Sequence, residues 1–569
     1  MSKQMYGWKR FWCPREASIN LSDGGYLYDP DSEWGRVYNP NVVSFDSIAQ
    51  IPCLILLGEP GIGKSHALKA EIETVKIKSK QEGDEVLELD LREYGSEDHL
   101  VRDLFANETV TAWKKGNHHL SIFLDSLDEG LLHIKVLSSL LARELNKLDK
   151  QLVSRLRLRI ACRTFDWSLN LSLEESLCEL WGKDAVQAYE LVFLRREDVT
   201  EAAKVNGFEP NEFLSAIDRA EAAPLAIKPI TLKFLLNFYR KNQSFPKTRT
   251  ELYLNGCRQL CEDPKPELRQ IQPTSAERRL IIAARIAAVT IFANRYAVWN
   301  DIDNGHVPDE DIPFQGLARG KEKAQENEFE VNEKVIRETL GTGLFSSRGA
   351  NRLGWAHQTY AEFLAAYYLV QSGMSHSQMM SLIVHPSDQE GKLIPQLHET
   401  AAWLASMVPA IFQQIMKTDP EVLLRSDVAT AEVKNRAALV ETLLKLYDEE
   451  KSLDFDWSKW KRYRKLSHPD LANQLQPYIG DKEKGVIVQR VAIDIAEACE
   501  VQALQEDLLT VALDPSQVLQ IRIEAAGAVS RIGDEATKAK LKPFAVNTSD
   551  DDPDDELNKN PLDGKCFTS

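Results

Sequence analysis

The sequence is poor in the features that mark several protein classes. Its eight cysteines are scattered over 569 residues without a repeated spacing. This pattern argues against a disulfide framework and predicts reduced thiols. Cys257 and Cys261 share one face of an expected helix, but no second ligand pair or histidine cluster accompanies them, so zinc is not expected.

Long apolar runs and an excess of positive charge are also missing. The most membrane-like stretch, Leu280 to Trp299, contains Arg285, Asn294 and Arg295, which predicts a buried helix rather than a membrane span. The first residues lack the apolar core of a signal peptide. The formal net charge of −17 argues against non-specific binding to nucleic acid or anionic lipid, because both need a basic face. We therefore expect a cytoplasmic protein without a membrane partner.

One stretch carries a specific chemical signature. An apolar run ending at Leu57 is followed by the pattern G-x-x-x-x-G-K-S, which is typical of a phosphate-binding loop. Its glycines let backbone N–H groups turn toward phosphate oxygens. Lys64 brings a cation to the β- and γ-phosphates, Ser65 offers a ligand to Mg²⁺, and the expected helix adds its positive dipole end. The predicted nucleotide-binding residues here are Gly58, Glu59, Pro60, Gly61, Ile62, Gly63, Lys64, Ser65 and His66.

Strand-like and helical patterns alternate between residues 50 and 200. This alternation predicts an α/β layer with a parallel sheet. The expected strands are Cys53–Leu57, Val86–Leu91, Leu120–Leu124, Leu158–Cys162 and Leu191–Leu194.

Two of these strands end in residues with catalytic potential. Asp125 ends an apolar run, which predicts a carboxylate that holds Mg²⁺ beside the phosphate loop. Asp128 or Glu129 would then orient or deprotonate the attacking water, and the sequence does not choose between them. Arg163 follows the next strand and would contact the γ-phosphate or stabilise the transition state. A surface arginine within an alternating Arg-Leu pattern is an equal alternative for Arg163.

Asn146 to Asp149 spell Asn-Lys-Leu-Asp, a guanine-reading motif of GTPases. In those enzymes the motif follows a strand. Here it is expected in an amphipathic helix whose polar side carries Asn146 and Lys147. A preference for GTP is therefore not predicted.

The remainder of the chain is expected to be mostly helical. Residues 484–543 show an internal repeat of paired helices rich in alanine, which predicts an α-solenoid. The tail from Asp550 is acidic and has no apolar period, which predicts disorder. The expected domains are 1–49, an irregular N-terminal cap; 50–200, the nucleotide-binding core; 201–270, a helical domain; 271–370, a winged-helix domain; 371–480, a second helical region; 481–545, solenoid repeats; and 546–569, the tail.

With these residues in hand, the chain resembles a NACHT-type NTPase of the STAND class, with an AAA-like phosphate-loop core. It is similar to bacterial antiviral members that have HEAT-like repeats. The ending from Leu124 to Glu129 resembles the family's extended Walker B motif, although the family usually has glycine where Ser126 stands. Cys162–Trp167 resembles the sensor-arginine segment, and Glu251–Tyr253 resembles a helical signature after the core.

The segment Trp355–Leu369 resembles the family's winged-helix segment. The resemblance implies that His357 contacts the β-phosphate of ADP and locks the resting state. It similarly implies that Pro229 packs near the adenine.

The resemblance implies a switch that uses ATP, ADP and Mg²⁺. It would be closed with ADP, would respond to an activating ligand such as a phage protein, and would self-associate with ATP. Slow hydrolysis would reset it. Two alternatives stay open: an AAA+-type motor ATPase acting on DNA or protein, and a repeat scaffold with a structural nucleotide. The family usually has an N-terminal effector and many more repeats, so this chain is expected to be a shortened form of a longer protein.

Overall fold

A computed structural model describes residues 6–134, 136–168, 171–262, 274–299, 307–324, 327–348, 352–449 and 460–542. The chain divides into two compact units, Met1–Tyr368 and Leu369–Ser569. The predicted acidic tail lies outside the described residues.

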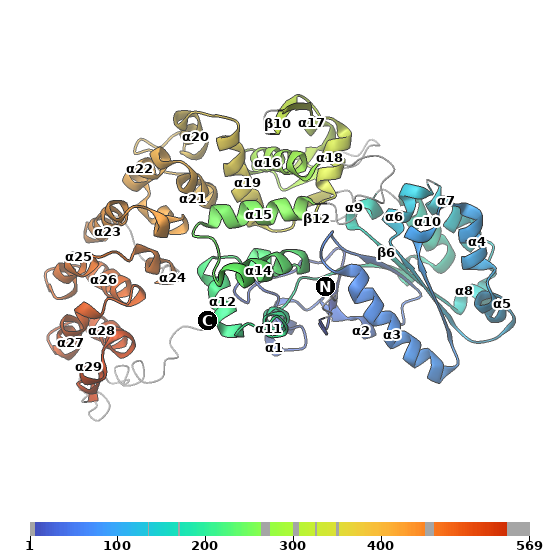
Figure 1. Cartoon of the computed structure of the whole chain (residues 1–569), viewed down its shortest axis with the longest axis horizontal. Coiled ribbons are helices and arrows are strands. Elements are labelled where there is room, and N and C mark those ends of the chain that lie inside the picture. Colours follow the sequence, from blue (N-terminus) through green and yellow to red (C-terminus); the bar gives the residue numbers. More distant parts are fainter. Residues whose placement is uncertain are drawn as a thin grey trace. The chain divides into compact units, whose positions relative to one another are not determined.

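A seven-stranded, mostly parallel sheet organises the first unit (Figure 1). Its strands are β1 (Phe11–Pro14), β2 (Val43–Ser44), β3 (Cys53–Leu57), β4 (Glu85–Asp90), β5 (Leu120–Asp125), β6 (Leu156–Cys162) and β7 (Val186–Leu191). They lie in the order β2-β1-β7-β3-β6-β5-β4, and β3 to β7 are parallel. The strand before the phosphate loop, β3, therefore lies in the interior of the sheet. β6 separates it from β5, the strand that ends in Asp125.

Helices cover both faces of this sheet, and other helices follow it along the chain. In the first unit they are α1 (Glu33–Tyr38), α2 (Phe45–Ile48), α3 (Lys64–Glu82), α4 (Glu97–Phe105), α5 (Glu108–Lys115), α6 (Leu127–His133), α7 (Leu137–Leu145), α8 (Lys150–Ser154), α9 (Thr164–Ser168), α10 (Leu171–Trp181), α11 (Arg196–Val205), α12 (Pro210–Arg219), α13 (Ala223–Ala226), α14 (Pro229–Asn242), α15 (Arg249–Cys261), α16 (Ala276–Phe292), α17 (Phe314–Leu317), α18 (Glu333–Leu340) and α19 (Gln358–Gln371).

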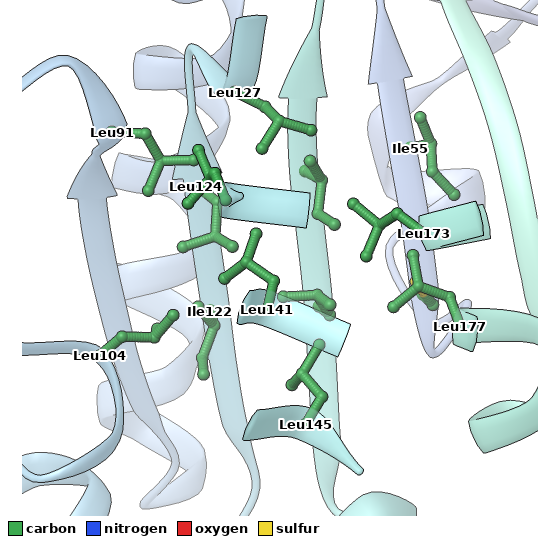
Figure 2. Packing of buried hydrophobic residues seen from close by; sticks show 14 of the residues in the cluster. Ile55, Leu91, Leu104, Ile122, Leu124, Leu127, Leu141, Leu145, Leu173 and Leu177 are labelled. Atoms are coloured by element: carbon green, nitrogen blue, oxygen red, sulfur yellow. The ribbon is translucent and has the colours of Figure 1, made fainter. Parts of the chain in front are cut away.

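Alternate residues of β3 enter two hydrophobic clusters. Ile55 packs in a cluster with residues of α4, α5, α7 and α10, and Figure 2 shows Leu141 and Leu173 in that layer. Leu54 and Leu56 enter the other cluster, which includes α3. Every residue of β3 is buried, as expected for a parallel strand covered by helices on both faces.

Two predictions about the edge of the sheet were wrong. The N-terminal segment is not an irregular cap. Its strand β1 pairs antiparallel with β7, and β2 pairs antiparallel with β1. The last predicted strand, Leu191–Leu194, is instead Val186–Leu191. The apolar run continues through Leu194, so the sequence does not show that the strand ends at Leu191. The amides of Val192 and Leu194 donate hydrogen bonds outside the parallel ladder, to the carbonyl oxygens of Phe11 and Ile227.

The Asn-Lys-Leu-Asp motif also lies elsewhere than expected. Helix α7 ends at Leu145 with Asn146 as its C-cap. Asp149 is the N-cap of α8, and its side chain accepts a hydrogen bond from the Leu152 amide at 2.8 Å. The motif is therefore a turn between two helices, where polar residues are favoured as caps.

A second, smaller sheet lies in the later part of the first unit. Its strands are β8 (Ala297–Trp299), β9 (Asp311–Pro313), β12 (Phe345–Ser347) and β13 (Arg352–Trp355), in the order β12-β13-β8-β9. β12 pairs antiparallel with β13. A separate hairpin joins β10 (Lys321–Ala324) and β11 (Asn327–Glu330). Gly343, shortly before β12, and Ala356, directly after β13, lie at the site described below.

The second unit is helical. Its helices are α20 (His376–Ile383), α21 (His398–Met407), α22 (Pro409–Thr418), α23 (Val433–Asp448), α24 (Trp460–Tyr463), α25 (Leu471–Ile479), α26 (Val486–Ala498), α27 (Gln505–Leu513), α28 (Leu519–Ile532) and α29 (Glu535–Ala539). The last four match the predicted repeat helices. Ala525 and Ala528 of α28 are fully buried, and Asp534 caps α29 through the Thr537 amide at 2.8 Å. Among the described residues of the whole chain, no helix is both long and apolar enough to cross a membrane.

Candidate functional site: a phosphate loop at the edge of the sheet

The loop from Gly58 to Gly63 joins β3 to α3. Gly61 and Gly63 have φ angles of +78° and +91°, a region that residues with a Cβ rarely adopt. A Cβ on Gly61 would also lie 2.4 Å from Cγ2 of Ile230, at the start of α14. Conformation and space therefore both require glycine at position 61. Gly63 is the N-cap of α3, so the loop delivers the chain into the positive end of that helix.

Lys64, Ser65 and Asp125 meet where α3 begins and β5 ends. Burial raises the pKa of the Asp125 carboxyl, while the charge of Lys64 and a side-chain hydrogen bond with Ser65 lower it. Oδ1 of Asp125 is buried and has no hydrogen-bond partner in the described part of the chain. Carboxylate and hydroxyl oxygens beside a phosphate are the ligands that Mg²⁺ takes. These residues therefore fit a Mg²⁺ ion. His66, in the first turn of α3, is exposed.

Acidic and basic side chains alternate along the same edge. Arg163, which follows β6, contacts Asp128 at 2.8 Å and Glu129 at 3.4 Å. Glu129 also lies 3.6 Å from Arg92, and Nε of Arg92 lies 2.7 Å from Asp90 at the end of β4. Five charges thus form one chain across the ends of three neighbouring strands. Arg163 lies at this edge of the sheet because it directly follows the last residue of β6.

The turn after β5 brings both candidate bases into this chain of charges. Ser126 has a φ angle of +62°, the left-handed region that favours glycine, and the resemblance leads us to expect glycine there. Burial raises the pKa of Glu129, and the charge of Asp128 raises it further, while Arg163 lowers it. Both carboxylates are held by the Arg163 guanidinium in this conformation. One of them has to leave it before it can act on a water molecule.

Lys228 ties the phosphate loop to the segment before β12. Its side chain is completely buried, pairs with Glu59 and donates a hydrogen bond to the carbonyl oxygen of Gly343 at 2.5 Å. Gly343 also touches the loop, because a Cβ there would lie 2.9 Å from the carbonyl oxygen of Pro60. A single ammonium group therefore joins three segments that are far apart in the sequence.

His357 lies beside the same group. Ala356, the residue before it, lines one cavity together with Glu59. Burial, together with the nearby charge of Lys228, lowers the pKa of His357 to about 4, so the imidazole is neutral at pH 7. Nδ1 accepts a hydrogen bond from the Thr359 amide at 3.2 Å, which places the proton on Nε2. A neutral imidazole with a proton on Nε2 can donate to a phosphate oxygen.

Pro229 and Arg10 border the start of α3. A Cβ on Gly63 would lie 3.4 Å from Cγ of Pro229 and 3.1 Å from Nη1 of Arg10. Arg10 donates hydrogen bonds to the carbonyl oxygens of Ile62 at 3.0 Å and Val192 at 2.6 Å. Burial lowers its pKa to about 10, so it stays charged at neutral pH. Among the described residues no carboxylate pairs with it, which leaves a buried positive charge next to the loop.

Sequence reasoning missed four members of this site. Asp90 ends β4 as Asp125 ends β5, but β4 alternates polar and apolar residues, so its signal was weaker. Lys228 is a single charge between apolar neighbours, which is a second usable signal. Nothing in the sequence marks Arg10 or Arg92, because their roles depend on contacts with distant segments.

Comparisons with known proteins add no assignment: no protein-family model matches the chain, and no curated protein matches it significantly.

Proposed function

We propose that this chain is a Mg²⁺-dependent switch of the STAND class that is controlled by ATP and ADP. The observation that carries the proposal is a convergence. The phosphate loop, the Ser65–Asp125 pair and the segment that bears His357 belong to one compact unit, and Gly343 lies against the Pro60 carbonyl. Residues that bind phosphate and residues of a distant small sheet therefore share one site.

Each residue has a role that follows from its position. The loop amides and Lys64 bind the β- and γ-phosphates. Ser65 and Asp125 hold Mg²⁺, which would neutralise phosphate charge. His357 donates a hydrogen bond to the β-phosphate of ADP and keeps the small sheet docked. Pro229 packs against the base, with Arg10 beside it.

Hydrolysis in this state is slow because the hydrolytic groups neutralise each other. Asp128 and Glu129 are paired with Arg163, so neither the base nor the arginine is free to act on a γ-phosphate. Conversion to an active arrangement separates these groups. This rearrangement belongs with the change from the ADP state to the ATP state.

In the cell, the proposed switch is cytoplasmic and belongs to bacterial antiphage defence. Its activating ligand, a phage protein for example, is sensed by the C-terminal helices, and the ATP state self-associates. These statements rest on the resemblance described above.

The test is to denature the purified chain and identify the nucleotide that it releases. Retained ADP supports the switch, whereas a chain that carries no nucleotide and hydrolyses ATP steadily is a motor. Lys64→Ala should abolish nucleotide binding, while Lys69→Ala, an exposed lysine of the same helix, should retain it. Unchanged ATP affinity in Lys64→Ala would refute the site.

The latch has its own test. His357→Ala should release ADP faster than the parent, because a phosphate contact is lost. His376→Ala, which removes an exposed histidine of the second unit, serves as the control. Equal release rates in His357→Ala and the parent would remove His357 from the mechanism.

A further inference from the structure

The cavity lined by Ala356 and Glu59 adjoins the phosphate loop and shares some of its residues with that loop. Its volume is about 350 Å³, within the range of small-molecule sites. Its walls come from residues 15–19 and 21 after β1, the end of β7, the loop residues Gly58, Glu59 and Ile62, and residues 346–348 at the end of β12. Lys64, Ser65 and Asp125 are not among the residues that line it, so it is distinct from the site of phosphate and Mg²⁺.

The cavity contains an acidic group without a partner. Glu190, at the C-terminal end of β7, lines it, and no residue of the described part of the chain makes a hydrogen bond or ion pair with its carboxyl group. One of its oxygens, Oε1, is buried and unpaired. A buried carboxyl group without a donor is costly. A bound molecule that supplies positive charge and hydrogen-bond donors would remove this cost.

Both basic side chains of the cavity have polar partners. Arg348 donates to the hydroxyl of Ser346 at 2.8 Å and to the carbonyl oxygens of Ser347 and Trp355. Arg15 lies 3.9 Å from Glu174, although its Nε is buried without a hydrogen-bond partner in the described part of the chain. Each arginine therefore has an acceptor or an anion beside it, whereas Glu190 has no partner among the described residues, and a cation is what Glu190 lacks.

The remaining walls also favour a cation with an apolar part. Phe193 and Tyr296 line the cavity, and aromatic faces attract organic cations. Glu16 adds a further carboxylate, whereas the carboxylate of Glu59 is paired with Lys228.

We propose that this cavity binds a small organic cation, an alkylamine or alkylguanidine, whose charged head pairs with the Glu190 carboxylate and whose apolar part contacts Phe193 and Tyr296. The site is independent of the proposed nucleotide switch, because the residues that recognise the cation do not bind phosphate.

Binding should be linked to proton release. Burial raises the pKa of Glu190 to about 8; Glu59 and Glu16 raise it, while Arg15 and Arg348 lower it. Cys13 on β1 is a further titratable neighbour, and its own pKa is raised to about 12, so it stays neutral. At pH 7 the Glu190 carboxyl is protonated, and pairing with a cation expels that proton. Affinity should therefore rise from pH 7 to pH 8 and level off above it.

The experiment is titration calorimetry of the full chain without nucleotide, using n-butylamine, n-butylguanidine and succinate as probes. The two cations should bind and succinate should not. Repeating the titration in two sulfonate buffers that differ in ionisation enthalpy should reveal proton release at pH 7. Failure of the nucleotide proposal leaves these measurements unaffected, since no nucleotide is present.

Two variants locate the site. Glu190→Gln keeps the shape and removes the charge, and it should weaken cation binding by about tenfold to a hundredfold. Ser18→Trp should block the cavity from its exposed edge. Glu85→Gln, an exposed carboxylate on β4, should bind as the parent does. Absence of cation binding to the parent, binding of succinate alone, or unchanged affinity in both Glu190→Gln and Ser18→Trp would each overturn the proposal.

Discussion

Replacing Glu59 by glutamine should release the phosphate loop from the rest of the unit. The substitution preserves the shape of the side chain but leaves the ammonium of Lys228 without its carboxylate. Lys228 is 0% exposed, so water cannot take the place of Glu59 without opening the structure. Removing one partner of a buried ion pair typically costs about 3–5 kcal/mol.

Amide hydrogen exchange of the nucleotide-free chain measures this penalty locally. Peptides that cover residues 58–63 and the segment around Gly343 should exchange roughly a hundredfold to several thousandfold faster in Glu59→Gln, since about 1.4 kcal/mol corresponds to a factor of ten. Glu88→Gln is the matched control. Glu88 pairs with Lys76 at 3.1 Å on the surface, where a pair contributes about 0–1 kcal/mol.

A double variant separates an unpaired charge from a lost contact. Glu59→Gln combined with Lys228→Met removes both charges and should restore slow exchange, because no buried ammonium remains. Fast exchange in the double variant equal to the single one, or parental exchange in Glu59→Gln, would refute this reasoning.

Three further predictions concern single positions. His357 has a folded pKa of about 4 against 6.5 unfolded, so the unfolded state binds an extra proton at acid pH. The free energy of unfolding should therefore fall by about 3 kcal/mol as the pH drops from 7 to 4. Thermal melts of His357→Gln should lack this pH-dependent component, and parallel pH curves for the variant and the parent would contradict the prediction. Arg10→Met leaves two buried carbonyl oxygens unpaired and should cost about 2–4 kcal/mol, whereas Lys9→Met, whose ion pair is exposed, should cost less than about 1 kcal/mol; equal shifts in unfolding midpoint would count against the role of Arg10. Ser126→Gly should stabilise the chain by about 0.5–1 kcal/mol, because it relieves a left-handed φ angle, and a lower melting temperature would show that the hydroxyl contributes more than the strain.

Local pattern was enough to predict the organisation of the α/β core. The strands that end at Leu57 and Cys162 both finish in apolar residues followed by glycine or a polar residue, and the structure ends them at those residues. The repeat helices were equally predictable, because alanine spacing and the capping Asp534 are properties of neighbouring residues. The limits of β7 were not, because its apolar run continues past the point where its hydrogen-bond partners change.

Part of the candidate site could likewise be predicted from local sequence, and part could not. The sequence alone determined the phosphate loop, since Gly58, Gly63, Lys64 and Ser65 are contiguous and their chemistry depends on local backbone geometry. It also placed Asp125 at the correct edge, because parallel strands end on one side of a sheet.

Only the tertiary structure decided that Arg10, Lys228 and Glu190 belong near this loop. Arg10 donates to the Ile62 carbonyl, and Lys228 pairs with the Glu59 carboxylate. Glu190 lines a cavity whose other walls come from segments distant in the sequence. A buried charge is stable only with partners at atomic distance. Those partners come from whichever segments the fold brings together, and no spacing along the chain encodes them.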